Sequence, residues 1–171
     1  NRKHTIEEYL QIIEKLKKTK SNIKFSSDFI IGYPGETQDD FEDTIELMKK
    51  VKFINSYSFI FSARPGTPSF DLKKIDDNLA KERLITFQSV SKKIKTEYRE
   101  KLLEKTMPVL FENKTKDENK YFGRDEYFNS VIVQSKKNLN GKIKNIKITK
   151  VSQNTLFGEI SSELIEKDFA A

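Results

Sequence analysis

The sequence contains no cysteine, no tryptophan and a single histidine, His4. Without cysteine the chain cannot form a disulfide, ligate an iron–sulfur cluster or use a thiol nucleophile, and one histidine cannot supply a His-rich metal site. No apolar run approaches the roughly 20 residues of a membrane span, and no signal segment is recognisable. We therefore expect a cytoplasmic protein with no membrane partner and no metal ligands of its own.

The chain does contain enough apolar material for a folded core. Of 171 residues, 36% are hydrophobic, including 13 Phe and 6 Tyr, and 34% are charged. This length suits one domain or slightly more, and the composition is not that of an intrinsically disordered chain. The chain opens on Asn1 and runs directly into a helix signal, so we expect its N-terminus to be a cut edge.

The first part of the chain alternates helix and strand signals. A T-x-x-E capping box at Thr5 precedes an amphipathic stretch over 6–19, and Thr37 precedes a second amphipathic helix. Strands are predicted over 23–31 and 57–61, each followed by a loop with glycine and proline. This alternation indicates parallel βα units, and because two strands cannot close a barrel, we expect the late part of a larger α/β domain.

The second part of the chain begins with a long helix and continues as short strands. Asp76 and Asp77 open a helical stretch of near-heptad spacing, and from Met107 the pattern changes to β. The predicted strands are 109–111, 121–123, 130–133, 142–151 and 155–160. Five short strands of this kind indicate a small OB-like barrel. The predicted organisation is an α/β part over 1–76, a connecting helix over 77–104, a barrel over 105–162 and a tail over 163–171.

Two loops follow the predicted parallel strands, where α/β proteins place ligand sites. In the first, 32–37, glycines let a ligand approach the backbone and the next helix N-terminus attracts anions, although a plain strand-to-helix turn explains the same pattern. Asp28 shares a strand face with Ile30; its carboxylate either binds ribose hydroxyls or an ammonium group, or is solvated. In the second loop, 62–68, Arg64 suits a carboxylate or phosphate, and a surface turn is the alternative.

A lysine-rich segment in the barrel region is the main feature of the charge distribution. Six lysines lie between positions 136 and 150 with no Asp or Glu among them. The aromatic and basic residues nearby are Tyr121, Phe122, Arg124, Tyr127 and Phe128. Lysines beside aromatic rings offer phosphate contacts and faces for base stacking, which indicates RNA binding. A solvated strand edge that discourages pairing with other chains is the alternative, and both remain open.

Two blocks of sequence resemble a known enzyme family. Residues 27–37 and 57–68 resemble the late barrel strands of the radical S-adenosylmethionine methylthiotransferases. Residues 123–128 and 148–159 are similar to the TRAM domain that ends these enzymes. The resemblance covers nearly the whole chain in family order, and the Arg-Pro-Gly-Thr-Pro loop is closest to the tRNA-modifying branch.

The resemblance implies an activity and its cofactors. The expected reaction adds a methylthio group to C2 of N6-isopentenyladenosine next to the anticodon, using S-adenosylmethionine and two [4Fe–4S] clusters in the intact enzyme. The cluster cysteines are absent, so we expect a C-terminal fragment that is inactive alone. Its implied partners are the N-terminal part of the same polypeptide, the tRNA anticodon stem-loop and a reductant protein. The alternatives are the branches acting on threonylcarbamoyladenosine tRNA or a ribosomal protein, or a stand-alone RNA-binding protein.

The candidate site residues fall into two groups, and none is expected to be a catalytic acid or base. By resemblance, the cofactor-binding candidates are Asp28, Gly32, Pro34, Gly35 and Arg64. Asp28 is expected to contact S-adenosylmethionine and the loop residues to form a wall, while Arg64 is assigned to either the cofactor carboxylate or an RNA phosphate. On the barrel, the RNA-binding candidates are Arg124, Tyr127, Lys142, Lys144 and Lys147.

Overall fold

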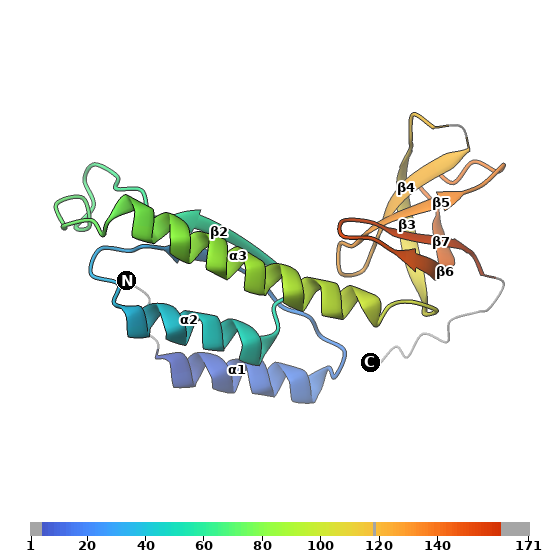
Figure 1. Cartoon of the computed structure of the whole chain (residues 1–171). Coiled ribbons are helices and arrows are strands. Elements are labelled where there is room, and N and C mark those ends of the chain that lie inside the picture. The colour runs from blue at the N-terminus through green and yellow to red at the C-terminus, as the bar shows by residue number, and fades with distance from the viewer. Residues whose placement is uncertain (1–4, 118, 162–171) are drawn as a thin grey trace. The chain divides into compact units, whose positions relative to one another are not determined.

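A computed structural model describes residues 5–117 and 119–161. The chain forms two compact units, and the division falls inside a helix between Lys95 and Thr96. Figure 1 shows the order of the elements, with helices and two strands in the first unit and strands in the second. The tail predicted over 163–171 lies outside the described residues. Among the described residues, no helix is both long and apolar enough to cross a membrane.

The first unit packs helices on one face of two parallel strands (Figure 1). Its elements are α1 (Ile6–Thr19), β1 (Ser26–Ile31), α2 (Gln38–Val51), β2 (Asn55–Ile60) and the first part of α3 (Asp77–Glu100). The predicted order of helix, strand, helix, strand is confirmed, with each strand displaced by a few residues from its predicted bounds. The predicted connecting helix ends at Glu100 and not at 104.

The helices of this unit begin where local capping signals place them. The Thr37 hydroxyl accepts a hydrogen bond from the Asp40 N–H at 3.1 Å, and the Asp40 carboxylate accepts one from the Thr37 N–H at 2.8 Å. The apolar stripe of α2 then faces the strands and buries its residues with those of the neighbouring elements. The buried core of the unit consists of Ile13, Ile31, Phe41, Ile45, Met48, Val51, Phe53 and Phe87.

The opposite face of the two strands is apolar and uncovered by the described residues. Ile30, Tyr57 and Phe59 are 60%, 63% and 57% exposed. Ile30 lies beside Phe59 and Asp28 lies beside Tyr57 in the parallel register, so their side chains share this face. Parallel sheets normally bury both faces, so this surface has the character of an interior one.

The second unit is a closed five-stranded barrel. Its strands are β3 (Thr106–Lys114), β4 (Lys120–Asp125), β5 (Ser130–Gln134), β6 (Ile143–Val151) and β7 (Leu156–Ile160). They close in the order β3-β4-β5-β7-β6, and only β5 and β7 pair in parallel. The predicted OB-like barrel is therefore confirmed. Its interior is filled by Val109, Phe111, Tyr121, Val131, Val133, Leu139, Ile146, Ile148 and Leu156.

Two glycines allow the barrel strands to approach closely. A Cβ atom on Gly123 would lie 2.5 Å from the Leu110 carbonyl oxygen, and one on Gly158 would lie 2.4 Å from the Lys147 carbonyl oxygen. These separations are far inside van der Waals contact, and the blocking atoms belong to the backbone of the neighbouring strand. The barrel can therefore close in this form only if both positions lack a side chain.

We predict that Gly158→Ala lowers the free energy of unfolding by about 3 kcal/mol, because strand β6 must move to admit the new methyl group. Gly141→Ala is the matched control, since its Cβ would meet no atom within 4 Å and the strain of its φ of +70° alone costs about 1 kcal/mol. Urea unfolding followed by circular dichroism measures both. Equal losses in the two variants would contradict the assigned role of Gly158.

Candidate functional site

The two predicted ligand loops start side by side at the carboxyl edge of β1 and β2. The Phe61 N–H donates a hydrogen bond to the Ile31 carbonyl at 2.8 Å, which extends the pairing to the last residues before the loops. The Tyr33 and Phe61 rings then meet edge to face with centroids 5.1 Å apart. The edge where open α/β sheets bind ligands thus carries both loops, joined by an aromatic contact.

The two glycines of the first loop have different roles. Gly32 and Gly35 have φ angles of +75° and +86°, which other residues adopt only under strain. A Cβ on Gly32 would lie 3.1 Å from that of Ala80 and 3.2 Å from Cδ1 of Ile75, whereas one on Gly35 would meet nothing within 4 Å. Gly32 therefore packs against the start of α3, and Gly35 alone presents open backbone to a ligand.

A buried ion pair holds this loop in place. The Arg83 guanidinium donates from Nη1 to Glu36 Oε1 at 2.7 Å and to the Glu36 carbonyl at 3.0 Å. The other carboxylate oxygen of Glu36 accepts the Gly32 N–H at 2.9 Å. The side chains of Arg83 and Glu36 are only 6% and 11% exposed, and Arg83 also lies over the Phe41 ring. The Gly32 N–H is therefore engaged within the loop and is not directed toward a ligand.

Sequence reasoning did not identify Arg83 as part of the site. The signal that could have found it is helical spacing, because Ala80, Arg83, Leu84 and Phe87 repeat at three- and four-residue intervals on one face of α3. A charged residue within an apolar stripe must have a buried partner. The sequence does not show which of many carboxylates is that partner.

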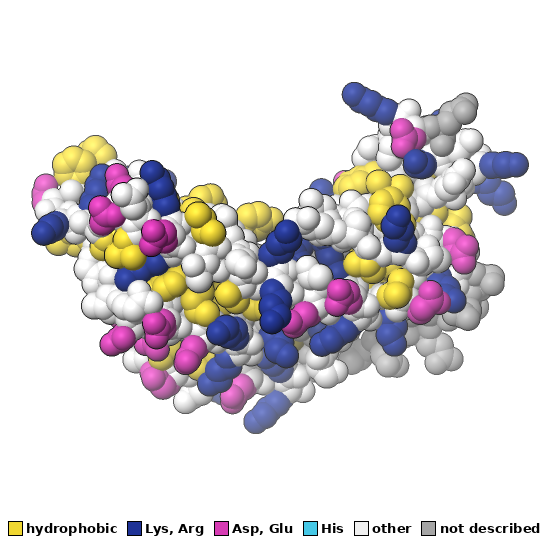
Figure 2. Space-filling view, in the orientation of Figure 1, with side chains coloured by type: hydrophobic (Ala, Val, Ile, Leu, Met, Phe, Trp, Pro, Cys, Tyr) yellow, Lys and Arg dark blue, Asp and Glu magenta, His cyan; other side chains and the backbone are white. Residues whose placement is uncertain are grey.

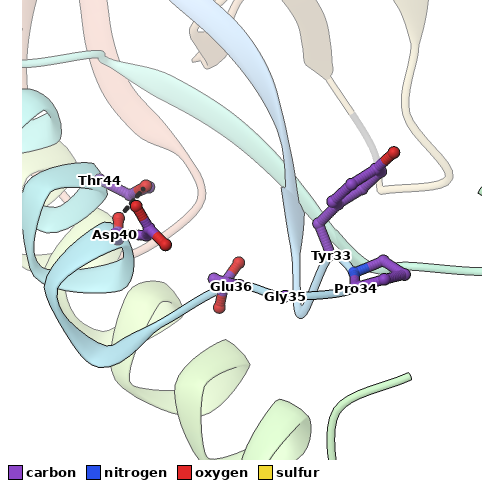
Figure 3. A pocket seen from close by; sticks show the side chains of 6 residues that line it. All are labelled: Tyr33, Pro34, Gly35, Glu36, Asp40 and Thr44. Carbon is purple, nitrogen blue, oxygen red and sulfur yellow. Dashed lines mark hydrogen bonds between the residues drawn. The ribbon is translucent and has the colours of Figure 1, made fainter. Parts of the chain in front are cut away.

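A pocket of about 340 Å³ opens beside the first loop (Figure 3). It is lined by Tyr33, Pro34, Gly35, Glu36, Asp40 and Thr44. Figure 3 shows Tyr33 and Pro34 at one end and the first two turns of α2, with Asp40 and Thr44, at the other. Hydrogen bonds from the backbone and side chain of Thr37 lower the pKa of the Asp40 carboxyl, so Asp40 is charged at neutral pH and committed to its cap.

Three of the five predicted cofactor residues, Asp28, Gly32 and Arg64, lie outside the lining of this pocket. Asp28 is exposed on the uncovered face of β1, and its carboxylate makes no hydrogen bond or ion pair with any residue in the described part of the chain. Arg64 is exposed in the second loop, where its carbonyl accepts hydrogen bonds from the Thr67 N–H and hydroxyl at 3.3 and 2.7 Å. The structure thus brings Pro34 and Gly35 together in the pocket but places Asp28 and Arg64 separately.

On the barrel, Arg124 is held by three neighbours. Its guanidinium lies 5.2 Å from the centroid of the Phe122 ring, and its Nε is 3.1 Å from the Glu112 carboxylate. Nη1 donates to the Phe128 carbonyl at 3.5 Å, and the side chain remains 40% exposed. Close by, burial and the neighbouring Glu126 carboxylate raise the pKa of Tyr127 to about 12, so its phenol is neutral at physiological pH.

The predicted lysine cluster does not form a single face. Alternation along β6 puts Lys144 on the side that carries Ile146 and Ile148, and Lys147 on the other. Lys147 forms an ion pair with Glu104 at 2.9 Å, whereas Lys142 and Lys144 are exposed. Figure 2 shows lysine and arginine side chains spread over both units. The basic character is therefore distributed. Of the three lysines predicted to bind RNA, Lys142 and Lys144 are exposed and Lys147 is half-buried.

Comparison with known families finds one match in each unit. The model of the Radical SAM superfamily matches residues 1–48, and that of the TRAM domain matches residues 100–161. In this chain a match to radical SAM sequence therefore precedes a match to the TRAM domain, whose residues form the barrel.

Three similar curated proteins are each named tRNA-2-methylthio-N(6)-dimethylallyladenosine synthase. The protein of Pelagibacter ubique (strain HTCC1062) is 48% identical over 167 residues, which is 98% of this chain and 37% of the relative. That of Wolbachia pipientis subsp. Culex pipiens (strain wPip) is 45% identical, over 92% of this chain and 37% of the relative. That of Agrobacterium fabrum (strain C58 / ATCC 33970) is 40% identical, over 94% and 36%. The chain spans about 37% of the length of the first of these relatives.

We predict that Arg83→Ala lowers the free energy of unfolding by about 3 kcal/mol, because it leaves the Glu36 carboxylate buried without a partner. Lys120→Ala, which breaks an ion pair whose side chains are 45% and 67% exposed, is the control and should cost less than about 1 kcal/mol. Chemical unfolding of both variants measures the difference. The double variant Arg83→Leu/Glu36→Leu removes both charges, so it should lose less stability than the sum of the two single leucine variants. A loss equal to that sum would contradict the energetic coupling of the two residues.

Proposed function

We propose that this chain is part of a tRNA methylthiotransferase that modifies an N6-isopentenyladenosine next to the anticodon. In this proposal the first unit supplies one wall of an S-adenosylmethionine site, and the barrel binds the anticodon stem-loop of tRNA in the cytoplasm. The observation that carries the proposal is the 48% identity to the Pelagibacter ubique synthase over 98% of the chain. The remainder of the polypeptide and a reductant protein complete the proposed set of partners.

The residues of the first unit suit a polar nucleoside-like ligand. Asp28 offers an unengaged carboxylate on an otherwise apolar face, where it can accept hydrogen bonds from ribose hydroxyls or an ammonium group. Gly35 offers open backbone, and the edge-to-face contact between Tyr33 and Phe61 joins the two loops at the strand ends. Arg64 is placed to reach a carboxylate or a phosphate from the second loop. When bound, S-adenosylmethionine supplies the radical precursor, and the residues of this chain bind and orient it.

The residues of this chain do not suit an iron–sulfur cluster. The sequence contains no cysteine, and among the described residues no three His, Cys, Asp or Glu side chains converge in a metal-binding group. In the proposal, both clusters are therefore held by other parts of the enzyme. The contribution of this chain is to bind substrates and to position them.

The barrel combines the elements of an RNA-binding surface. Lys142 and Lys144 are exposed cations without ion pairs in the described part of the chain, and Arg124 is a half-exposed guanidinium stacked on an aromatic ring. Such groups supply phosphate contacts and base stacking without reading the sequence. Tyr127 is neutral at physiological pH, but its hydroxyl is already hydrogen-bonded to the Glu126 side chain, so it contributes less to phosphate binding in this proposal. Lys147 and Arg124 are each paired with a glutamate, Glu104 at 2.9 Å and Glu112 at 3.1 Å, so at both positions an RNA phosphate competes with that carboxylate.

We expect Lys142→Ala/Lys144→Ala to weaken binding of this chain to tRNA and to flatten its salt dependence. Each lysine that no longer neutralises a phosphate should reduce the slope of log affinity against log salt concentration by about 1. Lys49→Ala/Lys50→Ala on the exposed side of α2 removes the same charge from the other unit and is the control. Fluorescence anisotropy over a salt series measures both. Equal salt slopes for the two double variants would contradict a phosphate contact. They would leave the alternative that these lysines form a solvated strand edge.

A second test concerns the division of labour between this chain and the rest of the enzyme. We expect a preparation of this chain, reconstituted with iron and sulfide, to retain no iron after desalting and to form no methylthiolated tRNA. Iron quantification by inductively coupled plasma spectrometry and nucleoside mass spectrometry measure the two quantities. Stoichiometric iron on the purified chain would contradict the assignment of the clusters to other parts of the enzyme.

A further inference from the structure

The turn between β4 and β5 is locked by a buried carboxylate. Asp125 is 7% exposed, and its Oδ1 accepts the N–H groups of Tyr127 and Asn129 at 2.9 and 2.8 Å. Its Oδ2 accepts the Asn129 side-chain amide at 2.8 Å, and that amide also donates to the Tyr98 hydroxyl at 3.3 Å. The turn from 125 to 129 is therefore held by contacts at its base.

Phe128 occupies the one position of this turn where a bulky side chain is least favourable. Its φ is +61°, a left-handed conformation that hairpin turns normally fill with glycine or asparagine. The Phe128 N–H donates to the Asp125 carbonyl at 3.1 Å, so the turn itself imposes this geometry. The side chain is also 74% exposed and therefore gains little from burial. Phe128 thus bears a conformational cost that packing in the fold does not offset.

Arg124 and Phe122 form a cationic and aromatic cluster beside the backbone of Phe128. The Arg124 guanidinium lies over the Phe122 ring, pairs through Nε with the Glu112 carboxylate at 3.1 Å and donates from Nη1 to the Phe128 carbonyl at 3.5 Å, which limits its orientations and leaves it 40% exposed. An exposed aromatic ring beside an ordered guanidinium is the arrangement with which proteins bind single-stranded nucleic acid: the ring stacks on a base, and the cation contacts the adjacent phosphate. An acidic peptide could also pair with Arg124, but it would not explain the exposed Phe128 ring, which suits stacking on a base.

We propose that Phe128 is a base-stacking residue, on whose ring an unpaired RNA base lies while Arg124 contacts the neighbouring phosphate. This inference rests on the proposed tRNA binding and deepens it, because it assigns the contact to an unstacked nucleotide rather than to the duplex stem. The locked turn holds the ring in position before binding, so that little conformational entropy is lost when the base arrives.

The first test separates binding from stability. Phe128→Asn retains a residue that tolerates left-handed backbone, so we expect it to unfold at a temperature no lower than the wild-type chain. The same variant should bind an RNA stem-loop with the sequence of a tRNA anticodon arm about 5- to 100-fold more weakly, the range for loss of one stacked base. Phe128→Tyr should bind the stem-loop as well as the wild-type chain does, because it keeps an aromatic ring at this position. A lowered unfolding temperature in Phe128→Asn would instead make Phe128 a structural residue and overturn the proposal.

The second test separates stacking from electrostatics. Loss of Phe128 should weaken stem-loop binding without changing the salt slope, whereas Arg124→Ala should weaken it and reduce the slope by about 1. Binding to a fully paired RNA duplex of the same length should be unaffected by Phe128→Asn. Ile143→Ala, at a barrel residue that is 62% exposed, is the control for loss of an exposed apolar side chain.

The outcomes distinguish this inference from the function on which it rests. If the wild-type chain binds neither RNA, the proposed tRNA binding fails. If Arg124→Ala weakens binding but Phe128→Asn equals Ile143→Ala, the tRNA binding stands and the stacking role is wrong. If Phe128→Asn weakens duplex and stem-loop binding equally, the contact is not to an unpaired base and the proposal is also overturned.

Discussion

The first unit depends on the buried contact between Arg83 and Glu36. One carboxylate oxygen holds the Gly32 N–H at the end of β1, and the other holds a guanidinium from α3, so a strand end, a loop and a helix share one charged pair. Two desolvated charges are tolerated only while both are paired, which leaves the loop a single arrangement. That arrangement turns Gly35 outward and places Pro34 on the wall of the pocket. The ion pair thus organises the candidate site, and its Glu36 also forms part of the pocket lining.

The barrel obeys a different constraint, that of close backbone approach. Strand alternation requires every second residue to face inward, and at Gly123 and Gly158 the inward space is already filled by the neighbouring strand. The residues on either side of Gly123, Phe122 and Arg124, then face outward together. A narrow barrel therefore generates an exterior pair of aromatic and cationic side chains as a consequence of how it closes. The same alternation along β4 thus places Gly123 inside the barrel and the two candidate side chains on its outer surface.

Local signals account for what could be predicted from the sequence. Capping at Thr37, helical periodicity and strand alternation depend on residues a few positions apart, and the elements they predict are present. The contact between Arg83 and Glu36 joins residues 47 positions apart, so no local pattern contains it. The lysine segment shows a related limit of local patterns. Its lysines are close in sequence, but alternation along β6 puts Lys144 and Lys147 on opposite sides of the strand. To predict the site residues, one must know which face of its element each side chain lies on and which other groups already fill that space.

The exposed apolar residues of the two units have different physical explanations. Ile30 and Phe59 lie on regular strands, without backbone strain, on the kind of sheet face that parallel α/β architectures bury. Packing alone explains why such residues are apolar. Phe128 stands on a strained turn and is more exposed than either, so packing explains neither its conformation nor its size. A side chain that costs stability and contributes no burial is accounted for by what it contacts outside the fold, which makes the β4–β5 turn the more informative of the two surfaces about function.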